Sequence, residues 1–389
     1  MISNRLQHTK PSATLAINAK AIEMKKRGID VIKFGTGEPD FDTPDNIKAM
    51  VVKAVEEGFT KYTATDGISE LKEAICNKLL RDNAIATKPE NVIVSNGGKQ
   101  ALYNCFMALL NPGDEVILPS PYWVSYADMV ELAEGVVKTV DTTGNRFKLT
   151  AEMVRNAIGP KTKALVLNSP GNPTGAVIDR KEIEAIAQLA LKHDFFVVSD
   201  EVYECFNYTG EPSFSIASIP TMKDRVFTVN AVSKTYAMTG WRIGYLAGPA
   251  DFVKGMATLQ GHMTSNPCSI AQKAALEALN GPQDSVKAMA TEYRKRRDFV
   301  FETMNRIPGF KLEMPEGVFY AFPDVSACYQ GSILDSVSFS QFLLEKARVA
   351  VIPGIAFGQE GDRFIRLSYA SSMKDLEEGL ERIRKAVGE

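Results

Sequence analysis

Short apolar runs alternate with amphipathic stretches between about residue 90 and residue 250 of this chain. Each run is continuously apolar, which is the pattern of a strand whose sheet is covered by helices on both faces. The alternation therefore predicts an α/β fold with a mainly parallel central sheet. The expected strands lie at residues 91–95, 115–118, 163–167, 195–199 and 225–229, and one of the expected helices lies at residues 180–192.

The pattern changes after about residue 285. A long helix is expected there, followed by separated strand candidates and a last helix, which together indicate a smaller α+β unit. In the last helix Ser372 and Asp375 form a possible capping box, and apolar residues recur at three- and four-residue steps from Met373 to Val387. The strand candidates are residues 318–322, 349–352 and 364–367.

The two ends of the chain are expected to meet in this smaller unit. Residues 1–45 contain one helix pattern, at 13–27, and a loop at 35–40. We expect them to form an arm that packs with a small domain at 286–389, while residues 46–285 form a large domain. A chain of 389 residues is long enough for two domains.

Composition and charge exclude several classes of protein. Hydrophobic residues make up 45% of the chain and charged residues 24%, and the formal net charge of −2 lacks the basic excess of a nucleic-acid-binding protein. No apolar run reaches the roughly 18 residues of a membrane span. The amino terminus shows no apolar signal region, so we expect a cytoplasmic protein without nucleic-acid or membrane partners. Its one dense charged run, residues 293–298, is expected to be a solvated helix face.

The histidines and cysteines form no recognisable metal or disulfide pattern. The three histidines are far apart, and the five cysteines are odd in number and have no CxxC spacing. We therefore expect neither a metal ion nor a disulfide framework.

A glycine-rich turn follows the first expected strand. The turn Asn96–Lys99, with Gly97 and Gly98 at its centre, stands between strand 91–95 and an apolar helix at 100–110. This arrangement presents free backbone N–H groups and a helix dipole to a phosphate. A Gly-Gly turn before a helix is also common as plain punctuation, so both interpretations stay open. It is not a dinucleotide fingerprint, because GxGxxG is absent.

Polar residues also follow the expected strands 163–167 and 195–199. Residues 168–175, which include Asn172, contain two prolines and two glycines and fix a rigid turn where α/β folds bind ligands. Asp200 follows the next strand, where burial of a carboxylate is costly unless a cation pairs with it. It is either the cap of the next helix or the counter-ion of a buried cation.

Three basic residues stand in apolar surroundings. Lys234 follows strand 225–229, and Arg242 lies eight residues further on between two glycines. A lysine beneath a buried sheet is a candidate Schiff-base amine, although a surface position is the commoner case for any single lysine. Arg366, between apolar neighbours on a strand, is either an edge residue facing water or a fork for a buried carboxylate.

Together and in this order, these motifs resemble the class I/II aminotransferases of the fold-type-I pyridoxal-phosphate enzymes. The resemblance covers nearly the whole chain, from Lys10 to Arg366, and is closest to the bacterial aspartate aminotransferase subgroup, which overlaps with the prephenate aminotransferases. It implies pyridoxal 5'-phosphate as cofactor and Lys234 as the residue that carries it and moves a proton during transfer. Asp200 is then expected to pair with the pyridine nitrogen.

The resemblance also implies the remaining cofactor contacts and a homodimer. Trp123 is expected against the ring face, and Asn172 and Tyr203 are expected to donate to its phenolate oxygen. Tyr62 from the other subunit is expected to reach the phosphate, which makes the site composite and the dimer obligate. Some relatives have a hydroxyl where this chain has Ala231, and Ser233 is the candidate to replace it. The other expected phosphate contacts are the N–H groups of Gly97, Gly98 and Lys99 and the fork of Arg242.

For the substrate, the resemblance implies that Arg366 binds the α-carboxylate, with Gly37 in the loop that closes over it. Trp123 and Asn172 are expected beside the substrate. One major branch of the family binds the distal carboxylate with an arginine from the partner subunit, but the comparable stretch here, residues 260–266, contains none. The candidates that replace this arginine are Lys99 and Ser12, with Thr14 and Lys10 close by, and the set Ser12, Thr14 and Lys99 is the one that matches the bacterial aspartate subgroup.

We therefore expect aspartate and glutamate as amino donors, with oxaloacetate and 2-oxoglutarate as keto partners. A prephenate or aromatic aminotransferase is the main alternative. A pyridoxal-phosphate lyase on the same scaffold would keep Lys234 and Asp200 and is less favoured. A regulator that binds the cofactor without turnover would carry a basic DNA-binding domain before the aminotransferase-like part, and we expect none here.

Overall fold

The computed structural model describes residues 13–388 of the chain. Its largest element is a seven-stranded sheet with the strand order β2-β8-β7-β6-β5-β3-β4. β8 runs antiparallel to both of its neighbours, and the other neighbouring pairs are parallel, so the predicted mainly parallel sheet is confirmed. The strands are β2 (Val92–Ser95), β3 (Glu115–Ser120), β4 (Val136–Asp141), β5 (Thr162–Asn168), β6 (Phe196–Asp200), β7 (Val226–Ala231) and β8 (Gly244–Ala247).

Helices cover both faces of this sheet. On β3, Val116 and Leu118 pack with residues of α5, α6 and α10, whereas Ile117 points to the opposite face and packs with α7 and α8. A strand buried on both faces must be apolar at successive positions, which explains the continuous runs in the sequence. The flanking helices are α3 (Asp45–Glu56), α4 (Ser69–Asn83), α5 (Gly98–Leu109), α6 (Ser125–Leu132), α7 (Ala151–Ala157), α8 (Arg180–His193), α9 (Val232–Thr235), α10 (Ala250–Met263) and α11 (Ser269–Asn280).

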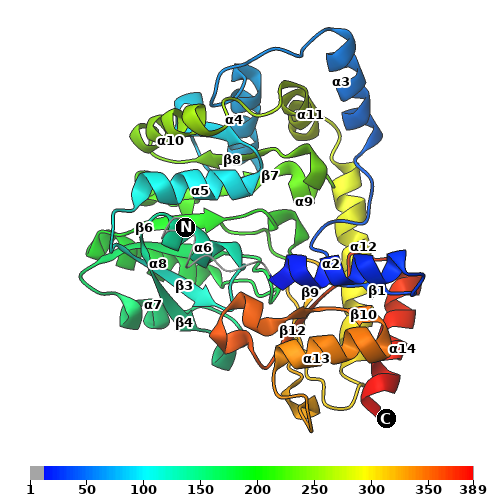
Figure 1. The fold of residues 1–389 in the computed structure, drawn as a ribbon. Coiled ribbons are helices and arrows are strands. Elements are labelled where there is room, and N and C mark those ends of the chain that lie inside the picture. The colour runs from blue at the N-terminus through cyan, green and yellow to red at the C-terminus, as the bar shows by residue number, and fades with distance from the viewer. Residues whose placement is uncertain (1–12, 389) are drawn as a thin grey trace, which may run out of the picture.

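Two small sheets form the other part of the molecule. One is antiparallel with the order β11-β12-β9, and the other pairs β1 in parallel with β10, so the two ends of the chain meet as expected. Figure 1 shows the blue α2 beside the orange and red helices α13 and α14. The elements are α2 (Ala13–Lys26), β1 (Ile32–Lys33), α12 (Asp284–Met304), β9 (Tyr320–Ala321), α13 (Ser336–Phe342), β10 (Val349–Ala350), β11 (Ile352–Pro353), β12 (Ile365–Ser368) and α14 (Met373–Gly388). The domain boundaries at residues 45 and 285 stay predictions.

The last helix, α14, follows its sequence pattern. Leu376, Leu380 and Ile383 are buried against the core of the smaller part, and Met373 and Val387 pack at its margin. The hydroxyl of Ser372 accepts a 3.1 Å hydrogen bond from the N–H of Asp375, which is one of the two bonds of the expected capping box.

The solvated face expected for residues 293–298 is only partly right: Arg294 and Lys295 are exposed, but the run also contains buried residues. Tyr293, Arg296 and Arg297 are buried on α12. Nη1 of Arg296 donates to both carboxylate oxygens of Asp40, at 2.8 and 2.9 Å, and Arg297 lies 5.0 Å from the ring centre of Tyr208. A carboxylate or an aromatic ring in contact with a basic side chain stabilises its charge inside the protein. Through the Arg296–Asp40 ion pair, the run connects α12 to the segment after β1.

Two strands of the large sheet are missing from the sequence-based prediction. β4 is an edge strand whose residues are exposed or half-buried, so it has no continuous apolar run. β8 is short and begins at Gly244, inside the segment that the sequence assigned to the lysine motif. β4 lacks the continuous apolar run of a strand buried on both faces. The four residues of β8 are all buried, but their run is short and lies next to the lysine motif, so it was not singled out.

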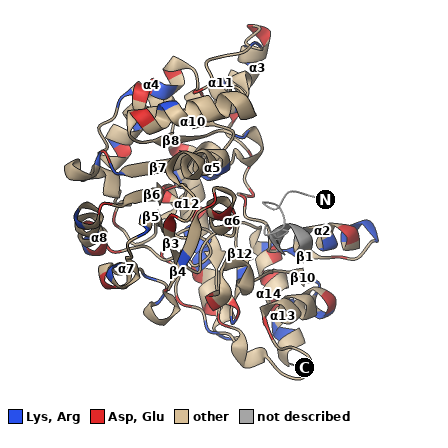
Figure 2. Cartoon of the chain, turned by 60° about the vertical axis from the view of Figure 1, so that its left-hand side comes forward, with Lys and Arg blue, Asp and Glu red and all other residues tan. Residues whose placement is uncertain are grey.

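Charged residues are mixed over the surface. Figure 2 shows Lys and Arg interspersed with Asp and Glu along the helices in that view. Of the helices between residues 13 and 388, none is long and apolar enough to cross a membrane.

Candidate active site

A cavity of about 830 Å3 lies where the two parts of the molecule meet. Asn168 ends β5, Asp200 ends β6 and Ala231 ends β7, and all three line the cavity. These strands are parallel, so their carboxyl ends share one edge of the sheet, which is where such folds bind ligands. The smaller part contributes Tyr320 from β9 and Arg366 from β12.

The glycine turn forms the start of α5 at this cavity. Gly97 is the N-cap with a φ of +82°, a conformation that favours glycine, and a Cβ there would collide with the guanidinium of Arg242. Its N–H already donates to the carbonyl of Ser95 at 2.8 Å. Of the three N–H groups expected for a phosphate, those of Gly98 and Lys99 remain, because the first N–H groups of a helix have no acceptor within it. The turn therefore has the geometry of an anion site.

Arg242 is held beside this turn by backbone contacts. It has a φ of +57°, and its guanidinium donates to the carbonyls of Thr239 at 2.9 Å and Asn96 at 3.3 Å. Ser233, which is buried, lines the same cavity next to Lys234. The guanidinium and the start of α5 thus border the same part of the cavity.

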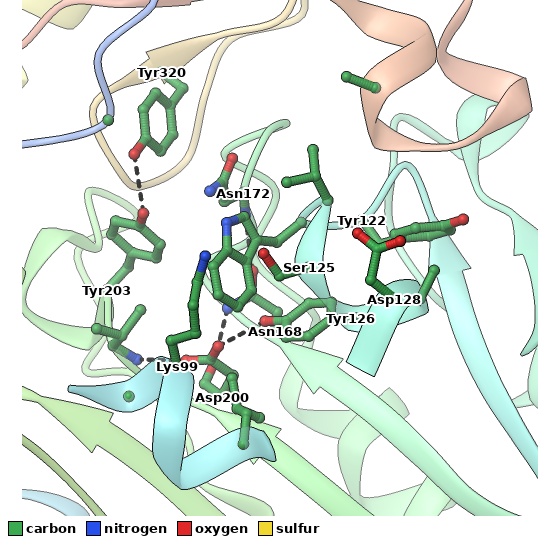
Figure 3. Close-up of a pocket in the computed structure, with 18 of the residues that line it drawn as sticks. Lys99, Tyr122, Ser125, Tyr126, Asp128, Asn168, Asn172, Asp200, Tyr203 and Tyr320 are labelled. Carbon is green, nitrogen blue, oxygen red and sulfur yellow. Dashed lines mark hydrogen bonds between the residues drawn. The ribbon is translucent and has the colours of Figure 1, made fainter. Parts of the chain in front are cut away.

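Asp200 is buried at the floor of the cavity. Its carboxylate accepts hydrogen bonds from the hydroxyl of Tyr126 at 2.7 Å and from the N–H of Val202 at 3.2 Å (Figure 3). Burial raises the pKa of Asp200 to about 6, and these two hydrogen bonds oppose the rise. Asp200 belongs to none of the ion pairs within residues 13–388, and the N-cap position of the following short helix is Tyr203 and not Asp200. The carboxylate is therefore suited to bind a cation rather than to cap a helix.

Lys234 lies in α9 with its amine directed to the loop of residues 35–38. Its Nζ donates to the carbonyl of Gly37 at 2.5 Å. Burial lowers the pKa of Lys234 to about 8, and the positive charges of Arg366, Arg242 and Lys99 lower it further, against the opposing effect of Glu38. A lysine with this pKa is partly neutral near physiological pH, as a nucleophilic or proton-transferring amine requires.

Arg366 is a buried guanidinium at the opposite wall, with only 3% of its surface exposed. It donates to Oδ1 of Asn172 and to the carbonyl of Gly35, both at 3.0 Å, while its buried Nε has no hydrogen-bond partner. No ion pair of the described chain includes Arg366, and burial lowers its pKa. The edge position facing water is thereby excluded, and a carboxylate fork is favoured.

Two asparagines connect this guanidinium to the strand ends. Oδ1 of Asn168 accepts from the N–H of Asn172 at 2.9 Å, and Nδ2 of Asn168 donates to the carbonyl of Asp200 at 2.9 Å. Because Oδ1 of Asn172 is used by Arg366, its NH2 group remains as a donor.

Aromatic side chains form a further wall of the cavity. Trp123 meets Tyr126 edge to face at 5.2 Å, and the amine of Lys99 lies 5.0 Å from the ring centre of Trp123. Burial and then the charge of Arg242 lower the pKa of Lys99. The hydroxyls of Tyr203 and Tyr320 are 3.0 Å apart, and Figure 3 shows them pointing toward each other.

The structure brings most of the expected site residues to one cavity. Gly97 does not line this cavity but lies against the guanidinium of Arg242. Tyr62 lies outside the cavity, in the loop after α3, and is 90% exposed. Ser12 lies outside the described residues, and Thr14 is described only as part of the backbone of α2. The expected residues that line the cavity are Gly37, Gly98, Lys99, Trp123, Asn172, Asp200, Tyr203, Ser233, Lys234, Arg242 and Arg366.

Sequence reasoning missed three polar residues of this site. Asn168 was noted only as the start of a turn, and Tyr126 and Tyr320 carried no signal, because tyrosines in apolar segments are common core residues. Within residues 13–388, no group of three or more His, Cys, Asp or Glu side chains gathers as a metal-binding cluster.

Comparison with known proteins agrees with this site. The family model for aminotransferase class I and II matches residues 29–383. An aspartate aminotransferase from Bacillus sp. is 48% identical over 390 residues, which cover 100% of this chain and 99% of that relative. An aspartate/prephenate aminotransferase from Cereibacter sphaeroides is 48% identical over 394 residues, which cover 98% of each chain.

Solved structures show the same architecture. The aspartate aminotransferase from Thermus thermophilus with maleate has a TM-score of 0.94 and 46% identity, and the match covers 99% of each chain. The chain belongs to the class I and II aminotransferases, and the aminotransferase predicted from the sequence is confirmed.

Proposed function

We propose that this aminotransferase uses pyridoxal 5'-phosphate and moves the amino group of aspartate or glutamate to a 2-oxo acid in two alternating half-reactions. The observation that carries the proposal is Arg366, which faces the same cavity as Lys234 and has no carboxylate partner in the described part of the chain. A fixed, buried guanidinium is suited to bind a carboxylate. Amino acids and 2-oxo acids share an α-carboxylate next to the reacting carbon.

The residues of the cavity fit the cofactor. The N–H groups of Gly98 and Lys99 at the start of α5, together with Arg242, suit a phosphate. Asp200, a buried carboxylate hydrogen-bonded only to neutral groups, suits a protonated ring nitrogen. When bound, pyridoxal phosphate supplies a carbonyl that takes up the amino group and a ring that accepts electrons.

The side chains around the ring have separate tasks. Lys234, whose pKa burial lowers to about 8, would hold the cofactor and would then take the proton from the substrate α-carbon and deliver it to the C4′ carbon of the cofactor. The negative charge of Asp200 would favour the protonated form of the ring nitrogen. Each unit by which Asp200 raises the pKa of this nitrogen corresponds to about 1.4 kcal/mol. The NH2 group of Asn172 and the hydroxyl of Tyr203 would donate to the ring oxygen, and Trp123 would pack against the ring face.

A second carboxylate of the substrate is assigned to Lys99. Its side chain lies over Trp123 and lines the cavity on the same side as the start of α5. The family resemblance implies that Ser12 and Thr14 also contact this second carboxylate. Maleate, present in the Thermus thermophilus relative, is a dicarboxylate, which supports aspartate and glutamate as substrates. Prephenate also carries two carboxylates, and the aspartate/prephenate relative supports it as a second substrate.

The active unit in this proposal is a cytoplasmic homodimer. Val52 and Val55 on α3 are 57% and 50% exposed, and the neighbouring Tyr62 is 90% exposed. Apolar side chains exposed together in this way are typical of a surface that another protein covers. Tyr62 then reaches the phosphate in the site of the partner subunit. The five free cysteines favour a reducing compartment.

Cofactor attachment is tested by reduction. Protein loaded with pyridoxal phosphate should show a visible absorption band that borohydride abolishes, with the reduced cofactor fixed to the peptide that contains Lys234. Lys234→Ala should lose the fixed cofactor and keep its folded circular-dichroism spectrum. Fixation to a different lysine would contradict the assignment.

The reaction is tested without a keto acid. A transaminase converts its cofactor stoichiometrically to pyridoxamine phosphate when aspartate alone is added, whereas a lyase on the same scaffold does not. A panel of amino donors with 2-oxoglutarate and prephenate as acceptors then ranks the substrates by kcat/KM. Stoichiometric conversion with alanine but not with aspartate would reject the dicarboxylate assignment.

A further inference from the structure

Tyr320 contacts both Arg366 and Tyr203, two of the residues that line the cavity. It belongs to β9 in the smaller part, is 1% exposed, and lines the cavity. It is paired with Ser368 across the antiparallel β9–β12 ladder, so it shares a sheet face with Arg366, two residues from Ser368. The guanidinium carbon of Arg366 lies 4.4 Å from the ring centre of Tyr320, which is a close cation–π contact.

The hydroxyl end of Tyr320 is enclosed as well. A Cβ added to Gly37 would lie 2.7 Å from its oxygen, so the loop that accepts the Lys234 amine packs directly against it. On the other side the hydroxyl meets that of Tyr203 at 3.0 Å. Contacts with Arg366, the Gly37 loop and Tyr203 therefore fix the positions of the Tyr320 ring and of its hydroxyl oxygen.

The direction of the Tyr203–Tyr320 hydrogen bond decides what Tyr203 can do. A phenol has one proton, so a Tyr203 hydroxyl that donates to Tyr320 cannot also donate to a ligand. If Tyr320 donates, the proton of Tyr203 is available to the cavity, and the bond that Tyr203 accepts strengthens the one it donates.

The electrostatics favour Tyr320 as the donor. Burial raises the pKa of both phenols, and the nearby positive charge of Arg366 opposes the rise in both. The guanidinium of Arg366 stacks on the ring of Tyr320, with its carbon 4.4 Å from the ring centre, so this cation withdraws electron density directly from the Tyr320 phenol and makes its hydroxyl more acidic. The more acidic phenol of such a pair is the better donor.

We propose that Tyr320 is a positioning residue: its hydroxyl donates to Tyr203, which directs the proton of Tyr203 to the ring oxygen of the cofactor, and its ring holds the guanidinium of Arg366 in place for the substrate carboxylate. This inference rests on the proposed function, because it assumes that pyridoxal phosphate lies in the cavity. It links the carboxylate site of the smaller part to the cofactor site of the large sheet through one side chain.

The hydroxyl is tested with Tyr320→Phe, which keeps the ring. A donor to the ring oxygen stabilises the negative charge on that oxygen and so favours loss of the proton that changes the visible band. Weakening this donor should raise the pH midpoint of the band by roughly 0.3 to 1 unit, the size expected when a hydrogen bond that polarises a second one is removed. The midpoint is measured by absorption titration of the loaded protein.

A matched control separates positioning from loss of a buried hydroxyl. Tyr369 is fully buried in the same part, lies outside the cavity lining, and donates to the carbonyl of Val318 at 3.1 Å. Tyr369→Phe should leave the midpoint unchanged. An unchanged midpoint in Tyr320→Phe, or an equal shift in both variants, overturns the role of the hydroxyl. A wild-type protein without a visible band overturns the proposed function and this inference together.

The ring is tested with Tyr320→Leu and succinate as the probe. Succinate binding to the loaded protein, measured by calorimetry, should stay within about twofold of wild type in Tyr320→Phe. In Tyr320→Leu it should weaken by roughly threefold to thirtyfold, the range of a desolvated cation–π contact. Equal affinity in all three proteins overturns the role of the ring while leaving the titration result for the hydroxyl intact.

Discussion

The carboxylate of Asp200 accepts a 2.7 Å hydrogen bond from the hydroxyl of Tyr126, and no cation of the described chain pairs with it. The two residues lie 74 positions apart, one at the end of β6 and the other in α6. When Asp200 is ionised, its burial lowers the free energy of unfolding, because burial favours the neutral form of a carboxylate. This cost has a measurable pH dependence in the protein without cofactor.

Asp200→Asn should stabilise the cofactor-free protein at pH 8. Burial raises the folded-state pKa of Asp200 from 3.8 to about 6, so the wild type loses stability as the pH rises through this interval. A rise of about 2 units corresponds to about 3 kcal/mol. The difference in unfolding free energy between variant and wild type should therefore be about 3 kcal/mol more favourable to the variant at pH 8 than at pH 4. Thermal melts across this pH range check the prediction, and a pH-independent difference would contradict it.

A second cluster of buried charged residues lies near the ends of β6 and β7. Lys78 of α4 donates to Glu204 and to Asn83, and Nδ2 of Asn230 donates to Glu204 at 2.7 Å. Burial is the largest single effect on the pKa of Lys78 and lowers it, but the charge of Glu204 and the hydrogen bond to it, together with smaller effects of Tyr245 and Cys205, outweigh burial and raise the pKa, so the amine stays charged. Glu201 lies in the same cluster, and burial followed by the charge of Glu204 raises its pKa to about 7.

Lys78→Met should destabilise the protein by about 3–5 kcal/mol at pH 8, because it leaves buried carboxylates without a cation. The loss should be smaller at pH 6, since Glu201 is then protonated in the folded state and one negative charge is removed. Adding Glu204→Gln to Lys78→Met should recover part of the stability. Urea unfolding of the three proteins tests this, and a double variant less stable than Lys78→Met would show that the charge balance is not the cause.

Mixed dimers test whether Tyr62 serves the partner subunit. When wild type is mixed with the double variant Tyr62→Phe, Lys234→Ala, each heterodimer has one site with a lysine, and that site faces the damaged tyrosine. Its cofactor affinity should fall by roughly ten- to a hundredfold, the effect of losing one hydrogen bond to a charged group. The measurement is a cofactor titration of purified heterodimers.

The matched control is a mixture of the two single variants. Tyr62→Phe combined with Lys234→Ala gives a heterodimer in which one site has both the lysine and the partner's intact tyrosine, so its affinity should equal that of wild type. Wild-type affinity in the double-variant heterodimer would show that the phosphate site is not shared.

Lys99→Met should separate dicarboxylate from monocarboxylate substrates. The variant keeps the backbone N–H at the start of α5 and the approximate side-chain length, but removes the charge beside Trp123. A hydrogen bond to a charged group contributes about 1.5–3 kcal/mol, so kcat/KM for aspartate and glutamate should fall roughly ten- to a hundredfold. The value for alanine and the cofactor affinity should hardly change. An equal loss for alanine and aspartate would mean that Lys99 supports the cofactor or the fold.

The sequence identified the site residues that belong to turns with a local signature. Gly97 is needed for the close approach of Arg242 at the start of α5, and the asparagine-containing turn after β5 is rigid because of its prolines and glycines. It did not identify Tyr126 or Tyr320, because the hydrogen bonds that give them a role are made to residues 74 and 117 positions away. Nothing in their neighbouring residues distinguishes them from ordinary core tyrosines.

By itself the sequence determined five of the seven strands of the large sheet, the order of the motifs along them, and therefore the family of the protein. These features depend on apolar runs and turn residues, which act over a few positions. Only the tertiary structure decided that β8 inserts antiparallel between β2 and β7, that Arg296 is buried against Asp40, and that Tyr320 joins Tyr203 to Arg366. Each of these contacts joins distant segments, and its free energy depends on packing and desolvation that arise only when the two parts of the molecule close on one cavity.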